Sequence, residues 1–350
     1  KRTEPYRTTG PEKMVNVLVT GGAGFIGSNF VSYALNVHPD WQITTLDKLT
    51  YAGRRENLQE HDGNPRHQFV KGDVADLALA QELVKNADIV VHFAAETHVD
   101  RSIQSAGSFV TTDVYGTFVL LDAARTSSRL QKFVQISTDE VYGSVAEGSS
   151  IESDELLPRN PYAATKAGAD RLAYSYWSTY NVPVIITRAS NNYGPRQFPE
   201  KIIPLFSTNA IDNQPLPLYG DGQNVRDWLH VDDHCRALDL LLENGEPGEV
   251  YNIGGENEVT NATLTNRILK ILDRPASLIR PVDDRPGHDR RYSLDTTKLR
   301  RLGWKPSVPF DDGLVSVVNW YQSNEWWWRP IKHDDEGYRS YYEKQYGQQI

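Results

Sequence analysis

The sequence predicts an α/β fold in which a doubly wound parallel sheet is joined to a smaller C-terminal α/β lobe. In the first half of the chain, short apolar runs typical of buried strands alternate with runs of helical periodicity. A glycine-rich turn separates the first apolar run from the first helical run. The length of 350 residues exceeds what one hydrophobic core usually fills, so we expect a second lobe.

The composition argues against several classes of protein. The chain has 39% hydrophobic residues and a net charge of −9, which argues against a nucleic-acid partner. Polar residues interrupt every apolar run well short of about 18 residues, so we expect no transmembrane helix and no membrane partner. The single cysteine, Cys235, permits no internal disulfide framework and no cysteine metal cluster. With no recognisable secretion leader either, we expect a cytoplasmic protein.

Shifts in pattern predict three segments. Residues 1–13 carry charge, proline and glycine without periodicity, and we expect a loose N-terminal extension. Residues 14–190 hold the strand–helix alternation of the sheet domain. Residues 191–350 form mainly the second lobe, which we expect to bind substrate.

The first element of the sheet domain ends in a glycine fingerprint. Val15–Val19 predicts a buried strand, and Gly21, Gly24 and Gly27 follow it before a helical run begins. Gly21 permits a tight turn, Gly24 has no side chain to block a pyrophosphate, and Gly27 lets helix and strand pack closely. The N-terminus of the helix that follows attracts phosphates.

The second predicted strand, Trp41–Leu46, ends at Asp47, which lies twenty residues beyond Gly27. A carboxylate at this place accepts hydrogen bonds from the adenosine ribose hydroxyls and repels a 2′-phosphate, which favours NAD over NADP. Strand, glycine turn, helix and acid together predict a Rossmann-type dinucleotide site. The alternative is a purely structural glycine turn.

Two further strand ends are candidates for the cofactor site. Phe69-Val70 leads to Asp73, whose carboxylate would meet the adenine amine. Ile89–Phe93 predicts a buried strand, and Ala94 and Ala95 after it would let the backbone approach the cofactor closely. Simple packing against a neighbouring helix explains the two alanines equally well.

An acid pair follows the next strand. Val110–Arg125 predicts a helix and Phe133–Ile136 a short buried strand, after which the chain continues through a loop. That loop holds Thr138, Asp139 and Glu140. Adjacent carboxylates at the end of a buried strand cost desolvation and repel each other, so a nearby ligand is a natural reason to keep them. The alternative is a solvated turn with incidental acids.

A tyrosine and a lysine lie one turn apart on the next predicted helix. Tyr162 and Lys166 share one face of a helical run that continues through Tyr180. A tyrosine becomes a usable base only if its pKa falls, and a nearby ammonium group together with a positive nicotinamide ring would favour the phenolate. The alternative is an ordinary amphipathic pair.

The C-terminal half offers candidates for a substrate site. Asn191–Pro195 predicts a turn-rich crossing point between the lobes. Arg226 and Arg285 are candidates for a pyrophosphate, because a guanidinium binds phosphate oxygens bidentately. Surface solvation is the alternative for each such residue taken alone. The run Trp326–Trp328, which follows a predicted helix from Leu314, is expected to pack or to form an interaction edge.

Several long stretches carry a family resemblance. They read VTGGAGFIGSNF, HFAAETHVDRSI, STDEVYGS, PYAATKAGAD and NNYGPRQFPEKIIPLF, within a match that runs from Val15 to about Trp328. The chain resembles the extended short-chain dehydrogenase/reductases, the NAD-dependent epimerase/dehydratase family. It is most similar to the members that convert dTDP-glucose to dTDP-4-keto-6-deoxyglucose, so the resemblance implies this hydro-lyase activity.

The resemblance implies a catalytic role for each residue of the two motifs. Tyr162 takes the proton of the sugar 4-hydroxyl, Thr138 hydrogen-bonds that oxygen, and Lys166 holds the cofactor ribose and lowers the tyrosine pKa. The 4-ketone acidifies C5, where Glu140 removes the proton while protonated Asp139 assists the leaving 6-hydroxyl. NAD is regenerated in each turnover and is therefore expected to stay tightly bound.

The resemblance also implies which residues bind each ligand. The expected cofactor residues are Gly21, Gly24, Phe25, Ile26, Gly27, Asp47, Lys48, Leu49, Thr50, Asp73, Val74, Phe93, Ala94, Ala95, Thr97, Thr112, Tyr162, Lys166 and Asn192. The expected residues for the nucleotide-sugar substrate are Thr97, Thr138, Asn191, Glu200, Lys201, Ile202, Pro217, Tyr219, Arg226, Asn261, Arg285 and His288.

Domain roles and partners follow from the same resemblance. Residues 14–190 would bind NAD, and parts of about residues 225–255 would return to this domain, interleaving the two. A helix would begin at Asp232–Cys235, so we expect no metal site there. The helices Val110–Arg125 and Tyr162–Tyr180 would form the interface of a homodimer.

The chain departs from the family pattern at a few positions, and alternatives remain. Asp113 stands where family members often carry Asn, and Thr97 stands where Ser is common. A UDP-sugar 4,6-dehydratase, a nucleotide-sugar 4-epimerase and a non-enzymatic NAD- or nucleotide-sugar-binding module are the competing readings. Epimerases of the family do not carry the Asp-Glu pair after the threonine, and a binding module has no need of the Thr, Tyr and Lys residues.

Overall fold

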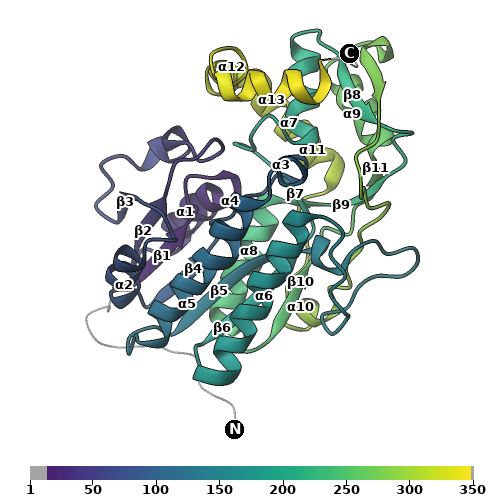
Figure 1. Cartoon of the computed structure of the whole chain (residues 1–350). Coiled ribbons are helices and arrows are strands. Elements are labelled where there is room, and N and C mark those ends of the chain that lie inside the picture. The colour runs from purple at the N-terminus through teal and green to yellow at the C-terminus, as the bar shows by residue number, and fades with distance from the viewer. Residues whose placement is uncertain (1–13, 348–350) are drawn as a thin grey trace.

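The computed structural model describes residues 14–347, and within them a seven-stranded parallel sheet forms the centre of the molecule (Figure 1). The strand order is β10-β6-β5-β4-β1-β2-β3. The strands are β1 (Val15–Thr20), β2 (Trp41–Asp47), β3 (His67–Lys71), β4 (Ile89–His92), β5 (Lys132–Thr138), β6 (Val184–Ala189) and β10 (Val250–Ile253). Because the chain leaves β1 toward β2 on one side and reaches β4 on the other, a crevice opens at the carboxyl ends of β1 and β4. The predicted N-terminal extension lies outside the described residues.

Helices cover both faces of this sheet, as predicted. Residues of α1 (Phe25–Val37) and α8 (Val231–Asn244) join one apolar core, and residues of α2 (Leu77–Lys85), α5 (Thr117–Arg125) and α6 (Pro161–Tyr180) join another. Figure 1 shows α5 and α6 side by side in front of the strands. Shorter helical segments are η1 (Arg55–His61), α3 (Val99–Gln104), α4 (Gly107–Phe109), η2 (Val110–Gly116), η3 (Asp139–Tyr142), η4 (Ala276–Leu278) and α10 (Thr297–Arg301).

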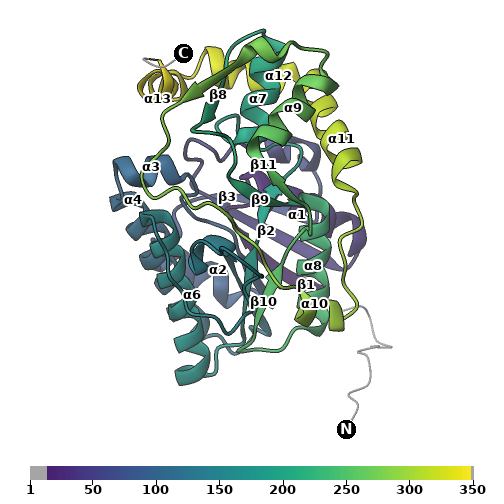
Figure 2. The same ribbon diagram turned by 90° about the vertical axis from the view of Figure 1, so that its right-hand side faces the viewer.

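The second lobe has its own apolar core and lies over the carboxyl edge of the sheet (Figures 1 and 2). Its strands are β7 (Asn191–Tyr193), β8 (Leu216–Tyr219), β9 (Val225–His230), β11 (Glu258–Thr260) and β12 (Ile279–Val282), which pair as β11-β9-β7 and β12-β8. Its helices are α7 (Ile202–Ile211), α9 (Asn261–Ile271), α11 (Phe310–Ser323), α12 (Glu325–His333) and α13 (Glu336–Tyr346).

Three predicted segments differ in detail from the structure. The expected turn at Asn191–Pro195 begins as strand β7, because Asn191–Tyr193 pairs in parallel with β9. Thr138 belongs to β5, and the expected loop at Asp139 is the single 3₁₀ turn η3. The helix predicted over Val110–Arg125 forms, but it starts as the π-helical segment η2 before α5.

Of the three C-terminal tryptophans, predicted to pack or to form an interaction edge, two are buried and one is exposed. Trp327 and Trp328 on α12 are buried, and their indole nitrogens donate to Asn57 Oδ1 and to the carbonyl oxygen of Tyr321, both at 2.8 Å. Trp326 remains 57% exposed. The chain thus contacts Asn57 of η1 before α13 crosses the second lobe.

The predicted domain boundaries stay a prediction, but the chain crosses between the lobes. After β7 enters the second lobe, α8 packs against α1 and β10 joins the edge of the main sheet. β9, by contrast, stays in the three-stranded sheet of the second lobe. No helix among residues 14–347 is long and apolar enough to cross a membrane.

Candidate active site

The glycine turn has the close contacts that its sequence predicts. Gly21 has φ +69°, and a Cβ atom on it would lie 2.6 Å from the backbone nitrogen of Ala94. A Cβ atom on Gly27 would lie 2.4 Å from the carbonyl oxygen of Gly21. Gly24 precedes α1 and lines the pocket described below. The turn is therefore held close to the β4 end, with the N-terminus of α1 beside the pocket.

Asp47 fastens this turn to the end of β2. Its carboxylate accepts hydrogen bonds from the backbone nitrogens of Ala23 at 2.9 Å and Leu49 at 2.8 Å. Burial raises the pKa of Asp47, and these two hydrogen bonds oppose that change. Leu49 has φ +56° and packs against the core without lining the pocket, so of the two residues Asp47 alone faces a ligand there.

Lys48 and Asp73 form an ion pair across the neighbouring strand ends, with 2.6 Å between Nζ and Oδ2. Burial raises the pKa of Asp73, but the hydrogen bonds from Lys48 and from the Ala75 backbone outweigh it and lower the pKa overall. This pair bounds the outer end of the pocket, where the sequence places the adenine.

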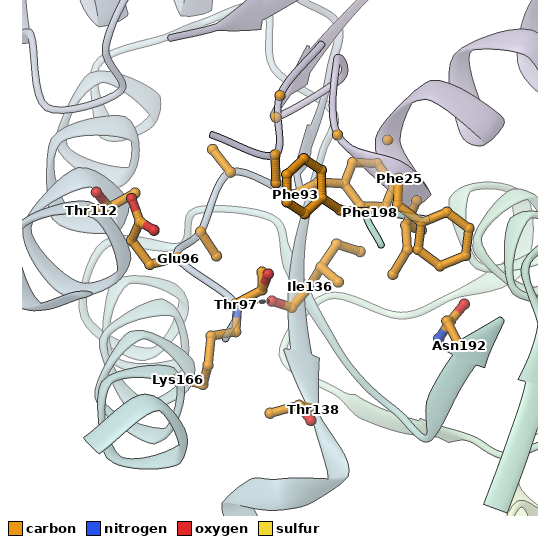
Figure 3. A pocket seen from close by; sticks show the side chains of 18 of the residues that line it. Phe25, Phe93, Glu96, Thr97, Thr112, Ile136, Thr138, Lys166, Asn192 and Phe198 are labelled. Atoms are coloured by element: carbon orange, nitrogen blue, oxygen red, sulfur yellow. Dashed lines mark hydrogen bonds between the residues drawn. The ribbon is translucent and has the colours of Figure 1, made fainter. Parts of the chain in front are cut away.

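A large pocket is lined by this pair and by Thr138, Asp139 and Glu140. Figure 3 shows part of its wall, including Thr138 and Lys166. Every residue predicted to bind the cofactor lines it, except Leu49. Within residues 14–347, six buried polar atoms of its lining residues have no hydrogen-bond partner: Ser137 Oγ, Asp139 Oδ2, Ser190 Oγ, Asn191 Oδ1, Gln197 Oε1 and His234 Nε2. Unpaired buried polar atoms are costly, so a polar ligand is the natural partner. The open glycine turn, the helix N-terminus and these atoms fit a dinucleotide.

The acid turn lies at the inner end of this pocket. Thr138 Oγ1 donates to Asp139 Oδ1 at 3.1 Å and accepts from the backbone nitrogen of Glu140 at 3.3 Å. Asp139 Oδ2 is buried without a partner among the described residues. Burial and the neighbouring Glu140 carboxylate raise the pKa of Asp139 well above its usual range. Both effects favour the protonated form of Asp139 beside the second carboxyl group.

Tyr162 and Lys166 reach the same place from α6. Lys166 donates from Nζ to the carbonyl oxygen of Ile136 at 2.6 Å, and burial lowers its pKa (Figure 3). A hydrogen bond joins the side chains of Tyr162 and Thr138. The structure differs from the sequence prediction in one respect: burial, Glu140 and Asp113 raise the pKa of Tyr162. Burial is the largest of these causes, and the hydrogen bond with Thr138 opposes them.

A second pocket in the other lobe opens onto the same acid turn. The residues predicted to bind substrate line this pocket or the larger one, and Glu140, Asn191, Glu200 and Lys201 line both. Glu140 Oε2 accepts a hydrogen bond from Asn160 Nδ2 at 3.3 Å. The two pockets thus meet at Glu140, where a ligand in each would be brought together.

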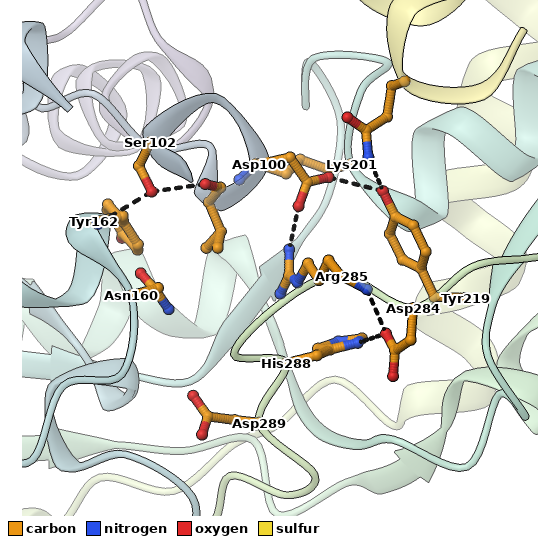
Figure 4. Close-up of polar contacts among 12 residues, drawn as sticks. Asp100, Ser102, Asn160, Tyr162, Lys201, Tyr219, Asp284, Arg285, His288 and Asp289 are labelled. Carbon is orange, nitrogen blue, oxygen red and sulfur yellow. Dashed lines mark hydrogen bonds and ion pairs between the residues drawn. The ribbon is translucent and has the colours of Figure 1, made fainter. Parts of the chain in front are cut away.

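Two arginines face the second pocket in different ways. Arg285 pairs with Asp100 at 2.9 Å, and its buried Nε atom has no partner among residues 14–347 (Figure 4). Arg226 donates to the carbonyl oxygens of Val225 and Asp289. No carboxylate of the described residues lies within ion-pair distance of Arg226, whose pKa burial lowers. The Arg226 guanidinium also lies 4.4 Å from the centre of the Tyr292 ring, and a buried guanidinium without a carboxylate partner is suited to an anionic ligand.

Sequence reasoning missed part of the second pocket. Asp100 accepts hydrogen bonds from Tyr219 at 2.9 Å and pairs with Arg285, as Figure 4 shows, so it orients two predicted residues. Tyr346 of α13 lines the pocket and lies 3.3 Å, oxygen to oxygen, from Tyr219. Asp100 lies in the motif HVDRSI, so the sequence contains a signal for it. No local pattern signals that the C-terminal helix, which carries Tyr346, folds over the pocket.

The stretch Asp232–Cys235 serves packing and pocket geometry. Asp233 accepts hydrogen bonds from the backbone nitrogens of Ser307 and Val308 at 2.9 and 3.0 Å. His234 Nδ1 lies 2.9 Å from Asn192 Oδ1, and burial lowers the pKa of His234 to about 3. The stretch opens α8, as the resemblance implied.

Comparisons with known proteins identify relatives of this chain. The family model described as GDP-mannose 4,6-dehydratase matches residues 18–317. A dTDP-glucose 4,6-dehydratase of Streptomyces niveus is 53% identical over 92% of this chain and 97% of its own. The solved structure of DesIV, the dTDP-glucose 4,6-dehydratase of Streptomyces venezuelae with NAD bound, is 52% identical, with a TM-score of 0.89 over 91% of this chain and 100% of that one.

Epimerases share the fold at lower identity. The UDP-glucuronic acid 4-epimerase of Bacillus cereus is 29% identical, with a TM-score of 0.83 over 88% of this chain and 99% of that one. The fold alone therefore does not distinguish a dehydratase from an epimerase. The distinguishing feature is the acid pair Asp139 and Glu140. By the family model and the relatives together, the chain belongs to the GDP-mannose 4,6-dehydratase family of the extended short-chain dehydrogenase/reductases.

Proposed function

We propose that this protein is a dTDP-glucose 4,6-dehydratase, an NAD-dependent hydro-lyase that produces dTDP-4-keto-6-deoxyglucose. The observation that carries the proposal is the pair Asp139 and Glu140, which lies between the two pockets and beside Tyr162. The high identity to dTDP-glucose 4,6-dehydratases over most of the chain supports the same activity.

Oxidation at C4 of the sugar is assigned to Thr138, Tyr162 and Lys166. NAD, when bound, accepts a hydride from C4 and later supplies it to C6, and its positive ring favours the phenolate of Tyr162. Tyr162 removes the proton of the 4-hydroxyl, and Thr138, which hydrogen-bonds Tyr162, orients that oxygen. Lys166 Nζ donates one hydrogen bond to the Ile136 carbonyl oxygen at 2.6 Å. This contact fixes the position of the ammonium group and leaves its other protons for the cofactor ribose.

Elimination of water across C5–C6 is assigned to the acid pair. Asp139 holds a proton because burial and Glu140 raise its pKa, so it can protonate the departing 6-hydroxyl. Glu140 lines both pockets and can reach the C5 hydrogen, which the 4-ketone has made acidic. One carboxyl group that keeps its proton beside one that accepts a proton is the combination that elimination requires.

The remaining site assignments belong to this proposal. The residues that line the larger pocket hold the dinucleotide, with Asp47 at the adenosine ribose. Arg226 and Arg285 bind the diphosphate of the nucleotide sugar, while Asn191, Lys201 and their neighbours hold the sugar between the pockets.

The direct test is the product formed from dTDP-glucose without added reductant. We expect a 4-keto-6-deoxy sugar, with no free NADH released. A C4 epimer as the only product, or consumption of UDP-glucose with dTDP-glucose untouched, would favour the competing enzyme readings. No product at all with either sugar would favour a binding module.

A homodimer is also proposed. The outer faces of η2, α5 and α6 expose apolar side chains, among them Val110 at 52%, Tyr115 at 48%, Phe118 at 37% and Tyr174 at 41%. Large apolar side chains gathered on neighbouring helices are typical of a protein–protein interface. A cytoplasmic location stays a prediction.

A further inference from the structure

Asp113 is a buried acid that the steps above leave unused. It lies in η2, it is 1% exposed, and it is not part of the wall of either pocket. Its Oδ1 atom accepts a hydrogen bond from the backbone nitrogen of Glu96 at 2.8 Å, and its Oδ2 atom accepts one from Thr165 Oγ1 at 2.8 Å. Both contacts lead to residues of the cofactor pocket or their direct neighbours.

The two contacts join separate parts of the site. Glu96 belongs to the loop after β4 that lines the cofactor pocket. Thr165 precedes Lys166 on α6, and its hydroxyl also contacts the carbonyl oxygen of Tyr162 at 2.9 Å. Asp113 thus links the cofactor loop to the helix turn that carries both residues of the oxidation step.

A carboxylate here does more than a neutral amide would. An asparagine could keep the Glu96 contact through its oxygen and, with the Thr165 hydroxyl turned toward Tyr162, donate to Thr165 through its nitrogen. What an amide lacks is the negative charge. That charge is buried near Lys166, where a low dielectric strengthens the attraction.

We propose that Asp113 is a positioning residue for the oxidation step: its carboxylate ties the cofactor loop to the Tyr162–Lys166 helix and carries a negative charge that an amide there would lack. The proposal rests on the proposed function, because that function gives Tyr162 and Lys166 their roles.

Several titratable groups surround Asp113 and determine how its charge changes with pH. Lys166 and Tyr162 act on it from α6, and Glu96 acts on it from the loop after β4. His92 Nε2 lies 3.0 Å from Thr117 Oγ1, and the Thr117 hydroxyl donates to the Asp113 carbonyl oxygen.

The pKa values of Lys166 and Asp113 depend on each other. Burial lowers the pKa of Lys166, whereas Asp113, together with Asp170, raises it. Burial raises the pKa of Asp113 to about 7, against the opposing effect of Lys166. Asp113 is therefore ionised mainly above neutral pH.

The first test is the pH dependence of nicotinamide reduction on mixing the protein with dTDP-glucose. In Asp113→Asn, Lys166 loses its proton at lower pH, so the alkaline limb of the rate profile moves down by about 1 pH unit or more. Below about pH 7 the two profiles keep the same shape, because wild-type Asp113 is itself neutral there. An unmoved limb, or one that moves to higher pH, would overturn the proposal.

Matched variants separate charge from packing. Asp122→Asn removes one carboxylate charge from α5, on the same continuous helix, and is expected to leave the profile unchanged. Thr165→Val removes the hydroxyl bridge and should slow nicotinamide reduction, while Thr165→Ser should restore it. If Ser does not restore the rate, the bridge is not what positions the helix.

The second test does not depend on activity. Infrared difference spectra between wild type and Asp113→Asn should show the wild-type carboxylic-acid band giving way to carboxylate as the pH rises through about 7. A carboxylic-acid band that persists to about pH 9 would overturn the proposal, since a neutral group supplies no charge. If wild type forms no 4-keto-6-deoxy sugar, the proposed function fails, whereas this titration still reports on Asp113.

Discussion

At the scale of residues, two neighbouring carboxyl groups of η3 lie in different surroundings. Asp139 is buried, with Oδ2 unpaired among the described residues, and its pKa is raised by burial and by Glu140. Glu140 lies where the two pockets meet and hydrogen-bonds Asn160 and, at 3.5 Å, Tyr292. Under the proposed function, Asp139 donates a proton and Glu140 accepts one, and elimination needs both roles.

Replacing Glu140 should separate oxidation from elimination. Glu140→Gln keeps the shape of the side chain but removes the base, so we expect product formation to fall by about 10²–10⁴-fold. The residues assigned to oxidation remain, so bound NAD should still be reduced by dTDP-glucose, and its reduced absorbance should persist. Stopped-flow spectra and product analysis measure the two steps. Unimpaired turnover would remove Glu140 from its proposed role.

Asp139→Asn is the matched variant, since it removes the acid and leaves the base. It should also allow nicotinamide reduction, but the loss of product formation should be smaller for substrates whose C6 leaving group needs no protonation. Equal losses with every leaving group would argue against Asp139 as the acid.

The place of a residue in the site was predictable from the sequence where it depends on neighbours in the chain. The glycine spacing and Asp47 anticipated the turn at the end of β1, and the acid pair anticipated where the pockets meet. The pKa of Tyr162 was not predictable, because Glu140 and Asp113 act on it from other elements. Leu49 sits in the middle of a motif, yet its side chain turns to the core.

At the scale of elements, hydrophobic periodicity identified the strands and helices that have a local sequence pattern. Strands β1 to β5 and helices α1 and α6 have clear patterns and appear where expected, whereas α8 was expected only from the family resemblance. β7 is only three residues long and exists because it pairs with β9, which lies more than thirty residues further along the chain. Pairing at that distance leaves no local signal.

A buried ion pair fixes the acid turn to α6. Arg188 of β6 pairs with Asp170 of α6 at 2.8 Å, with side chains 1% and 0% exposed. Arg188 also donates to the hydroxyl of Tyr142 in η3 at 2.7 Å. The turn that holds Asp139 and Glu140 is therefore anchored to the helix that holds Tyr162 and Lys166.

Breaking this pair should destabilise the protein strongly. Arg188→Met leaves Asp170 buried with only the half-exposed Arg171 as a partner, so the free energy of unfolding should fall by about 3–5 kcal/mol. Urea unfolding measures the change. The control is Arg290→Met, which breaks the exposed pair with Asp221 and should leave the midpoint unchanged. Equal effects of the two variants would contradict the anchoring role.

At the scale of the whole molecule, the site depends on both lobes and on the C-terminus. The sheet domain supplies most of the larger pocket, the second lobe supplies Arg226 and Arg285, and the pockets share Glu140, Asn191, Glu200 and Lys201. Helix α13 reaches the second pocket through Tyr346. The sequence predicted both lobes, but their junction depends on contacts between residues far apart in the chain.

The proposed dimer is testable through its exposed apolar face. Tyr115→Glu places a charge among Val110, Phe118 and Tyr174, and burying that charge at an interface is costly. We expect sedimentation velocity to show the wild type as a dimer and the variant mainly as a monomer. The same change at Trp326, which is exposed on α12, is the control and should leave the dimer intact. A monomeric wild type would contradict the proposal.

The central claim is that one site oxidises C4, eliminates water and reduces C6 within a single turnover. The most direct test is to supply dTDP-glucose with deuterium at C4, without external reductant, and to locate the label in the product. We predict that the label appears at C6 of dTDP-4-keto-6-deoxyglucose, because the deuteride removed from C4 is transferred to C6 by the nicotinamide. Label retained at C4 of a sugar with inverted configuration would contradict this account and indicate an epimerase.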